Sequence, residues 1–421
     1  MRTLIVAAGL AFSVPATADT SMIHAGHVIT DAARPASGPS TIIITDGRII
    51  SVETGYKPAP AGMRLIDLST KTVLPGLIDA HVHLSSEPGG DYRDESVLSD
   101  EYATMIGAKN ARVTVRAGFT TVRDLGSAPL VGFALRDATA KGLIPGPRIV
   151  SAGTAISIIG GHGDVSGFRP EVNAALDSGN TCTGPDQCAM RVREAMKRGA
   201  DVIKITATGG VLSQSDKGLG QHFTDIEMKA IVDTAHSLGL KVAAHAHSAR
   251  GIEAAARAGV DSIEHATFAD AAAIKAMKAN GTVFVPTLMA FTGIRERVGK
   301  GIYTPVVESK VRMTLSEVGK GLKAAQSANI TIVFGTDAGV FEHGRNAQEF
   351  TQMINLGGLT PAQALASATT SAAKLLDLEG QVGRIAPGYS ADIIAVNGDP
   401  LADISLLEKV SFVMVRGQVI E

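Results

Sequence analysis

Two histidines stand one residue apart in the apolar run Leu77–Leu84, which is typical of a β-strand. Because residues i and i+2 of a strand point to the same face, His81 and His83 are expected to project together, with Asp79 on the same side. Two imidazoles aimed at one point suit a divalent metal ion. A lone His-x-His pair on a strand more often belongs to the ordinary polar surface. A metal site would therefore need further ligands from other strands. Asp79 lies one layer deeper, and we expect it to support the ligands or to be a polar residue of the core.

Further ionisable residues stand within or at the ends of later strand patterns. Lys204 lies inside the apolar run Val202–Thr206, where a charge is costly unless it has a function. For a lone lysine, a different strand register is the alternative. Neighbouring cations would lower the pKa of this amine, and the neutral amine can take up carbon dioxide as a carbamate, an anion able to bridge two metals. The other members of the set are His245, His247, His265 and Asp337.

These residues need a framework that brings the ends of several strands together. Between residues 76 and 378 the sequence alternates strand and helix patterns eight times, which predicts an α/β fold with a (β/α)8 TIM barrel. In such barrels the active site lies at the C-terminal ends of the strands, where the candidate ligands stand. The expected strands are Leu77–His83, Thr120–Asp124, Arg148–Ala152, Val202–Thr206, Lys241–His247, Ser262–His265, Thr282–Pro286 and Thr331–Asp337.

Short strands separated by turn signals flank the barrel on both sides. Residues 19–75 contain a hairpin pattern with Asp46-Gly47 between two apolar runs, and residues 379–421 contain another near Gly417. We expect the two segments to share one sheet system, a small β-sandwich built from both ends of the chain. The segment Pro361–Leu376 is expected to be one helix that leads back to it.

Residues 1–18 have the features of a cleavable secretory signal peptide. Arg2 precedes an apolar stretch, and small residues precede Asp19. A buried N-terminal segment is the alternative. We therefore expect a periplasmic or secreted protein, a compartment in which Cys182 and Cys188 can form a small disulfide loop.

The composition limits the possible partners. The 421 residues include 39 basic and 41 acidic side chains, a formal net charge of -2, which gives no indication of nucleic-acid or anionic-membrane binding. We expect a small-molecule substrate and a homo-oligomer.

Taken together, these motifs resemble the amidohydrolase superfamily of metal-dependent hydrolases. The matching stretches are Pro75 to His83, Lys204, His245, His265, Gly335 to Asp337 and Gly383 to Asp392. The resemblance implies two divalent metal ions, usually zinc, one held by His81, His83 and Asp337 and the other by His245 and His265. Lys204, carrying a carbamate derived from carbon dioxide, and a hydroxide would bridge them. Asp337 would be catalytic, taking the hydroxide proton and returning it to the leaving amine.

Two glycine-rich stretches, Gly160–Asp164 and Thr208–Val211, resemble the imidazolonepropionase-like and Xaa-Pro dipeptidase-like branch, which includes bacterial enzymes that hydrolyse ochratoxin. The likeness implies that His162 is catalytic or binds substrate, polarising its carbonyl or holding its carboxylate; a turn histidine is the alternative. His247 stands where prolidase-like relatives often have a substrate-binding tyrosine. His343 is a further candidate for the substrate carboxylate, as are Arg295, Arg297 and Arg345.

We therefore predict a binuclear, zinc-dependent amidohydrolase that cleaves an amide bond in a dipeptide-like or N-acyl amino acid substrate, ochratoxin A among them. A cyclic-amide hydrolase and a non-catalytic metal-binding barrel are the alternatives. A deaminase is disfavoured, because such members of the superfamily typically lack the lysine on strand four. The polar loop Leu212–His222 is expected to overhang the pocket, either as a lid or as a solvated linker.

Overall fold

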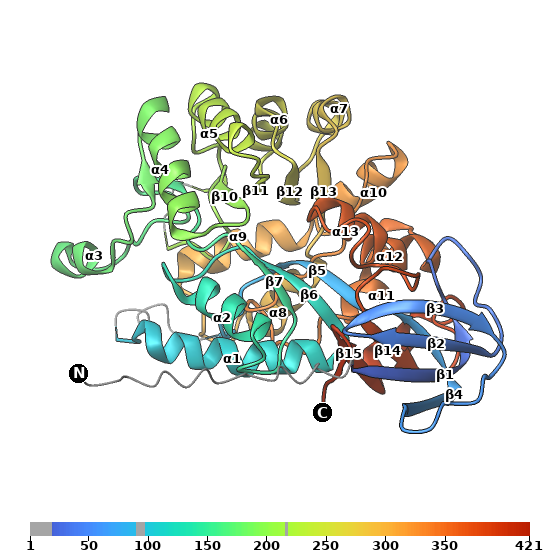
Figure 1. The fold of residues 1–421 in the computed structure, drawn as a ribbon. Helices are drawn as coiled ribbons and strands as arrows, with labels where there is room; N and C mark the ends of the chain where they lie inside the picture. The colour runs from blue at the N-terminus through green and yellow to red at the C-terminus, as the bar shows by residue number, and fades with distance from the viewer. Residues whose placement is uncertain (1–18, 90–96, 215–217) are drawn as a thin grey trace, which may run out of the picture.

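A computed structural model describes residues 19–89, 97–214 and 218–421. Figure 1 shows a barrel-like body of alternating strands and helices, with a separate sheet at one side of the molecule and α3 (Pro170–Leu176) at the opposite side. The predicted signal peptide, residues 1–18, lies outside the described residues. Among the helices of the described segments, none has both the length and the apolar character needed to cross a bilayer.

The two ends of the chain share one seven-stranded sheet, as predicted, with its strands in the order β16-β15-β14-β4-β1-β2-β3. Strand β14 pairs antiparallel with β4, so that Ile394 lies opposite Leu74. The strands form one continuous sheet, where we had expected a small sandwich. They are β1 (Thr20–Val28), β2 (Ser40–Thr45), β3 (Arg48–Thr54), β4 (Arg64–Pro75), β14 (Ile393–Val396), β15 (Phe412–Val415) and β16 (Gln418–Val419).

The two predicted hairpin turns of this sheet touch each other. Asp46 and Gly47 connect β2 to β3 with positive φ angles of 48° and 75°, as a tight two-residue turn requires. Arg416 and Gly417 do the same between β15 and β16. A Cβ atom on Gly47 would lie 2.5 Å from the carbonyl oxygen of Arg416, so only glycine fits between the two turns.

The barrel strands form two parallel arcs that isolated bridges join into a ring. Parallel bridges connect Ile156 to Ile205, Phe284 to Ile332 and Val82 to Ala338. The first arc contains β5 (Leu77–Val82), β6 (Phe119–Asp124) and β7 (Arg148–Ser151), and the second contains β10 (Ile203–Thr206), β11 (Val242–Ala246), β12 (Ser262–His265) and β13 (Val283–Val285).

The eighth predicted strand, Thr331–Asp337, is not a regular strand. It runs along the ring between β13 and β5 and makes bridges near its two ends only. Asp337 has a φ of 62° and Gly339 a φ of 118°, so the backbone leaves the extended conformation where it reaches β5. The stretch still completes the (β/α)8 architecture.

The helices cover the outside of this ring, and Figure 1 shows α4 to α7 side by side beyond β10 to β13. Local capping sets their ends: Thr224 and Glu227 form a capping box at the start of α5, and α6 ends at Gly259 in a left-handed conformation. The helices are α1 (Asp100–Arg116), α2 (Val131–Ala140), α3, α4 (Pro185–Arg198), α5 (Asp225–Ser237), α6 (Ala249–Ala258), α7 (Ala271–Asn280), α8 (Leu288–Arg297), α9 (Pro305–Leu315), α10 (Lys320–Ser327), α11 (Gln348–Gly357), α12 (Pro361–Ser367), α13 (Thr370–Leu375) and a 3-10 helix at Ile404–Lys409.

The helix expected at Pro361–Leu376 is divided into α12 and α13. The carbonyl of Ala368, between the two helices, accepts the backbone N–H of Ile78 at 2.8 Å. Thr369 has non-helical dihedral angles, φ -131° and ψ -93°. Strand β5 therefore takes a carbonyl that a continuous helix would use internally, and the interruption anchors the first barrel strand.

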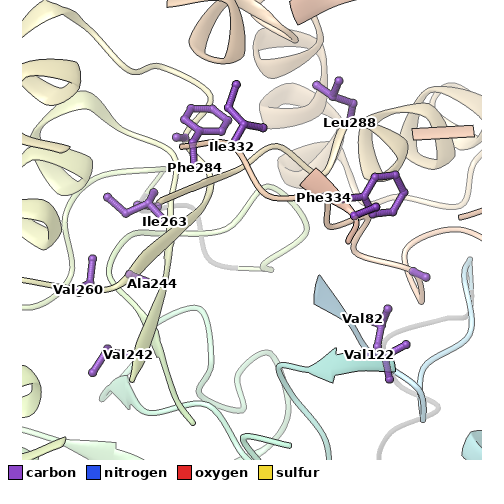
Figure 2. Close-up of a cluster of buried hydrophobic side chains, with 14 of the residues drawn as sticks. Val82, Val122, Val242, Ala244, Val260, Ile263, Phe284, Leu288, Ile332 and Phe334 are labelled. Carbon is purple, nitrogen blue, oxygen red and sulfur yellow. The ribbon is translucent and has the colours of Figure 1, made fainter. Parts of the chain in front are cut away.

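Apolar side chains fill the space between the strands and the helices. Figure 2 shows part of this core, which lies around β5, β6, β11, β12 and β13, and its labelled side chains are at most 8% exposed. Each buried Val, Leu, Ile or Phe side chain contributes about 1.5–3 kcal/mol to folding.

Beside the barrel, a disulfide joins Cys182, in the two-residue strand β9 (Thr181–Cys182), to Cys188 in α4, which confirms the predicted pairing. Strand β9 pairs with β8 (Ser157–Ile158).

Candidate metal centre and active-site cavity

A cavity of about 400 Å³ opens where the barrel strands end. Its wall includes the apolar side chains of Leu125, Val211, Phe291, Ile294 and Val340. The predicted metal ligands all line this one cavity, and two of the predicted substrate contacts line it with them. They are His81, His83, His162, Lys204, His245, His247, His265 and Asp337.

His81, His83 and Asp337 form the first part of the site. The Nε2 atoms of His81 and His83 lie 3.3 Å apart, and Asp337 Oδ1 lies 3.3 Å and 3.1 Å from them respectively. Burial raises the pKa of Asp337, but the adjacent imidazoles outweigh it and hold the pKa well below its ordinary value. The carboxylate is therefore ionised and faces two imidazole nitrogens at a distance that one cation could bridge.

The second part of the site is a group of three buried imidazoles, His245, His247 and His265, whose candidate ligand atoms lie within 4.8 Å of one another. His265 belongs also to a group with His81 and Asp337 that meets the same limit. Burial lowers the pKa of His245 and His265 well below 6.5, so the rings are neutral, as metal ligands must be. His247, for which a substrate contact was predicted, thus lies among the candidate ligands.

Lys204 lies on β10 between these two parts and is 4% exposed. Its Nζ atom is 3.5 Å from Nε2 of His81. Burial lowers the pKa of this amine from 10.5 to about 8. The neutral amine, which the predicted carbamate requires, is therefore accessible at mildly alkaline pH.

Hydrogen bonds behind the rings orient most of these imidazoles. Nδ1 of His83 lies 3.0 Å from the Gly126 carbonyl, and Nδ1 of His265 lies 2.6 Å from Thr287 Oγ1. Nδ1 of His247 is similarly held by Thr267 Oγ1 at 2.9 Å. With Nδ1 engaged outside the cavity, Nε2 is left for a metal ion.

A buried ion pair that sequence reasoning missed stands behind His81. Glu264 accepts from Arg123 at 3.0 Å and from Ser262 Oγ at 2.6 Å, and its other oxygen lies 2.8 Å from Nδ1 of His81. Burial raises the pKa of Glu264, but Arg123 and His81 lower it to about 2. Both residues are charged and lie within barrel strands, but each has only one apolar neighbour, so the signal that identified Lys204 between two isoleucines is missing here.

Asp79 supports the site from below, as one of the two sequence interpretations expected. It accepts hydrogen bonds from Thr336 Oγ1 at 2.6 Å, from Asn346 Nδ2 at 2.8 Å and from the backbone N–H of His81 at 3.1 Å. These bonds tie the first barrel strand to the segment that carries Asp337. Asn346 was not anticipated from the sequence.

His162 stands at the cavity wall beside the second group of imidazoles. Its ring centroid lies 4.4 Å from that of His245, and its Nδ1 is 2.5 Å from Ser213 Oγ. Burial lowers the pKa of His162 to about 3, so the ring is neutral near pH 7. A neutral imidazole in this position can donate one N–H to a bound molecule.

His343 does not occupy the position that its predicted substrate role requires. Its Nδ1 is 3.1 Å from Thr114 Oγ1 and its Nε2 is 3.2 Å from the carbonyl of His83. The chain turns back after Asp337, so both ring nitrogens of His343 are engaged behind the candidate metal centre. The ring is absent from the described cavity wall. We therefore correct the prediction: His343 supports the backbone of His83.

The three arginines considered for a substrate carboxylate also lie off the described cavity wall. Arg297 pairs with Glu342, and Arg345 pairs with both Glu296 and Glu342. Arg295 lines a separate depression between α8 and α11. These side chains belong to surface features outside the candidate metal centre.

The donors present fit a divalent metal. Imidazoles, among which burial keeps His245 and His265 neutral, and one ionised carboxylate converge from four different parts of the barrel. The protein engages Nδ1 in four of these rings, namely those of His81, His83, His247 and His265. This combination of nitrogen and oxygen donors is typical of zinc and related ions. Without a cation, Asp337 would be a buried anion compensated only by neighbouring imidazoles and Lys204.

Comparison with known proteins adds independent findings. The model of the amidohydrolase family matches residues 72–420. The ochratoxinase of Aspergillus niger is 31% identical over 419 residues, which covers 93% of this chain and 84% of that protein. A solved Xaa-Pro dipeptidase with bound methionine in its active site superimposes with a TM-score of 0.88 at 38% identity, over 96% of this chain and 100% of that one. A prolidase complexed with N-methylphosphonate-L-proline gives a TM-score of 0.86 at 31% identity, over 96% and 99% of the two chains.

Proposed function

The chain belongs to the amidohydrolase family, and from this premise we propose that it is a binuclear metal-dependent hydrolase of dipeptide-like or N-acyl amino acids. The observation that carries the proposal is the overlap of two ligand groups within one cavity. His265 belongs to both groups, and Lys204 lies 3.5 Å from His81 at the same site. A single structural metal would not require a second, overlapping set of buried donors.

The proposed ligands divide between two ions, expected to be zinc. His81, His83 and Asp337 would hold one ion, and His245 and His265 would hold the other. Lys204, as a carbamate, would supply a further anionic ligand at the same site. When bound, such a pair of ions activates a water molecule at neutral pH and polarises the amide carbonyl.

The chain's own residues then handle protons and orientation. Asp337 is ionised and close to both parts of the site, so its free oxygen can accept a proton and pass it to the leaving amine. His162 is neutral and can donate an N–H to the substrate carbonyl oxygen. His247 lies in the same wall and is available to either the substrate or the second ion.

The cavity wall supports a substrate with an apolar portion. Val211, Phe291, Ile294 and Val340 contribute apolar surface to the same cavity that the candidate ligands line. A wall of this kind accommodates a hydrophobic acyl group or amino acid side chain. We therefore propose Xaa-Pro dipeptides, N-acyl derivatives of apolar amino acids, and ochratoxin A as the first substrates to examine.

The experiment combines metal analysis with a substrate panel. Purified protein is expected to contain two divalent ions per chain and to release the free amino acid from at least one member of the panel. Protein treated with a chelator should lose this activity and regain it with zinc. Absence of bound metal after growth with added zinc would refute the proposal, whereas hydrolysis of cyclic amides alone would redirect it to the alternative substrate class.

Export and self-association are further parts of the proposal. The apolar N-terminal segment supports secretion or a periplasmic location. N-terminal sequencing of protein from the extracellular or periplasmic fraction should place Asp19 first. Light scattering of the purified protein tests the expected homo-oligomer.

A further inference from the structure

A short turn that follows β10 bends across the cavity wall. Thr208 forms an antiparallel bridge with Gln221, and the Gly209 N–H donates to the Gly220 carbonyl at 3.0 Å. These contacts hold the two ends of the loop together. Val211 and Leu212 line the cavity from this turn. Residues 215–217 lie outside the described part of the loop. The residues of the loop that contact His162 lie within residues 210–213.

His162 rests against this turn in two ways. Ser213 Oγ lies 2.5 Å from His162 Nδ1. A Cβ atom on Gly210 would lie 2.2 Å from Cε1 of the same ring, so the ring packs directly on the glycine backbone and no larger residue fits there. The position of residues 210–213 therefore determines the orientation of the imidazole.

The turn is itself held by a buried lysine on another element. Lys310, on α9, is 6% exposed, and its Nζ donates to the carbonyls of Gly210 at 3.1 Å and Ser213 at 2.6 Å. Val307 and Val311 of the same helix belong to an apolar cluster that also contains Val211. A lysine buried beside such a cluster is costly unless its donors are used, and here they are used at the two residues that contact His162.

We propose that Lys310 is a positioning residue for His162. By holding the Gly210 and Ser213 carbonyls, it fixes the turn on which the imidazole rests. The Ser213 hydroxyl, 2.5 Å from Nδ1, can donate to that nitrogen, and in this arrangement the proton of the neutral ring is on Nε2. That N–H then meets the substrate carbonyl oxygen. The last step rests on the proposed function, whereas the fixed tautomer and orientation do not.

The kinetic test asks whether Lys310 acts through His162. Lys310→Met removes the donors at similar length, and Arg312→Met on the same helix, which is exposed, is the matched control. In the otherwise unchanged enzyme, Lys310→Met should lower kcat about 10-fold to 100-fold, with little change in KM or in bound metal. In a His162→Ala background the same substitution should cost less than about 2-fold, because the residue it positions is gone.

An equal loss in both backgrounds would overturn the proposal, since it would show a general structural role. Ser213→Ala provides a second variant that leaves Lys310 and the turn in place, and it should reproduce part of the loss in kcat.

A spectroscopic test is independent of activity. In protein labelled with ¹⁵N at its histidine rings, the signals absent from His162→Ala identify His162, and their shifts report which nitrogen carries the proton. We expect an Nε2-protonated ring in the unmodified protein and a mixture of tautomers in Lys310→Met. An unchanged His162 signal in Lys310→Met would overturn the proposal even if no substrate were hydrolysed. If no substrate of the panel were hydrolysed but the His162 signals behaved as expected, the result would count against the proposed function alone.

Discussion

Glu264 Oε2 lies 2.8 Å from Nδ1 of His81, and both side chains are at most 1% exposed. The other oxygen of Glu264 is paired with Arg123, which reaches across the barrel from β6. The carboxylate therefore holds the proton of His81 on Nδ1 and turns Nε2 toward Asp337. The orientation of one proposed metal ligand thus depends on a buried ion pair that stands behind it.

Glu264→Gln should weaken metal binding. The amide keeps the size of the side chain but loses the charge that orients His81, and we expect metal affinity to fall about 10-fold to 100-fold. Competition with a coloured chelator measures this affinity directly. Because Arg123 is left without its buried partner, the variant should also unfold at a lower temperature.

Glu194→Gln is the matched control, because this glutamate pairs with Arg191 near the surface of α4. It should change neither metal affinity nor thermal stability appreciably. Wild-type metal affinity in a folded Glu264→Gln protein would show that His81 does not need this partner.

Lys204→Ala should remove both bound metal and turnover. The site would lose the group proposed to bridge the two ions, while the small side chain leaves space at the centre of the cavity. Addition of a short carboxylate such as acetate should restore part of the metal content and activity, since it can occupy the position of the carbamate. Lys229→Ala, on the exposed face of α5, serves as the control. Full activity of Lys204→Ala without added carboxylate would exclude the bridging role.

Asp337→Asn tests the proposed proton transfer. The amide cannot accept a proton in the way that the ionised carboxylate can, so kcat should fall by about 10² to 10⁴. Metal content should be measured on the same sample, because Asp337 is also a proposed ligand. A variant that keeps both metals and normal turnover would contradict the role of Asp337 in catalysis.

The sequence predicted the features that depend on local periodicity. The two-residue repeat of a strand placed His81 and His83 on one face, and the alternation of strands and helices placed their strand in a barrel with Lys204 and His265. A charge inside an apolar strand is also visible in sequence, which is how Lys204 was found.

Features that depend on packing between distant segments were not accessible in this way. The pairing of Arg123 with Glu264 joins β6 to β12 across the barrel, and no local pattern defines that distance. His343 follows a strand end and resembled a cavity residue, yet the turn after Asp337 takes it behind His83. The irregular eighth segment is a similar case: Asp337 has a left-handed backbone, and its N–H donates to the carbonyl of His81 in β5 at 2.7 Å, a contact between segments far apart in the sequence.

Asp124, buried at the end of β6, should make the stability of the metal-free protein depend on pH. Burial raises its pKa from 3.8 to about 6, and the hydrogen bond from the Leu84 N–H opposes this only in part. Between these two values the folded chain holds a proton that the unfolded chain has released. The free energy of unfolding should therefore decrease as the pH rises through this window, by about 3 kcal/mol in total.

Asp124→Asn should remove that part of the pH dependence, because the amide does not titrate. Urea unfolding of chelator-treated protein at several values from pH 4 to pH 7 would compare the two slopes, with Asp137→Asn on α2 as an exposed control. The wild-type protein and the control should lose stability relative to Asp124→Asn as the pH rises toward 6, and the difference should then stay constant. Parallel profiles for all three proteins would mean that Asp124 ionises normally despite its burial, and that local rearrangement or water relieves the cost of its charge.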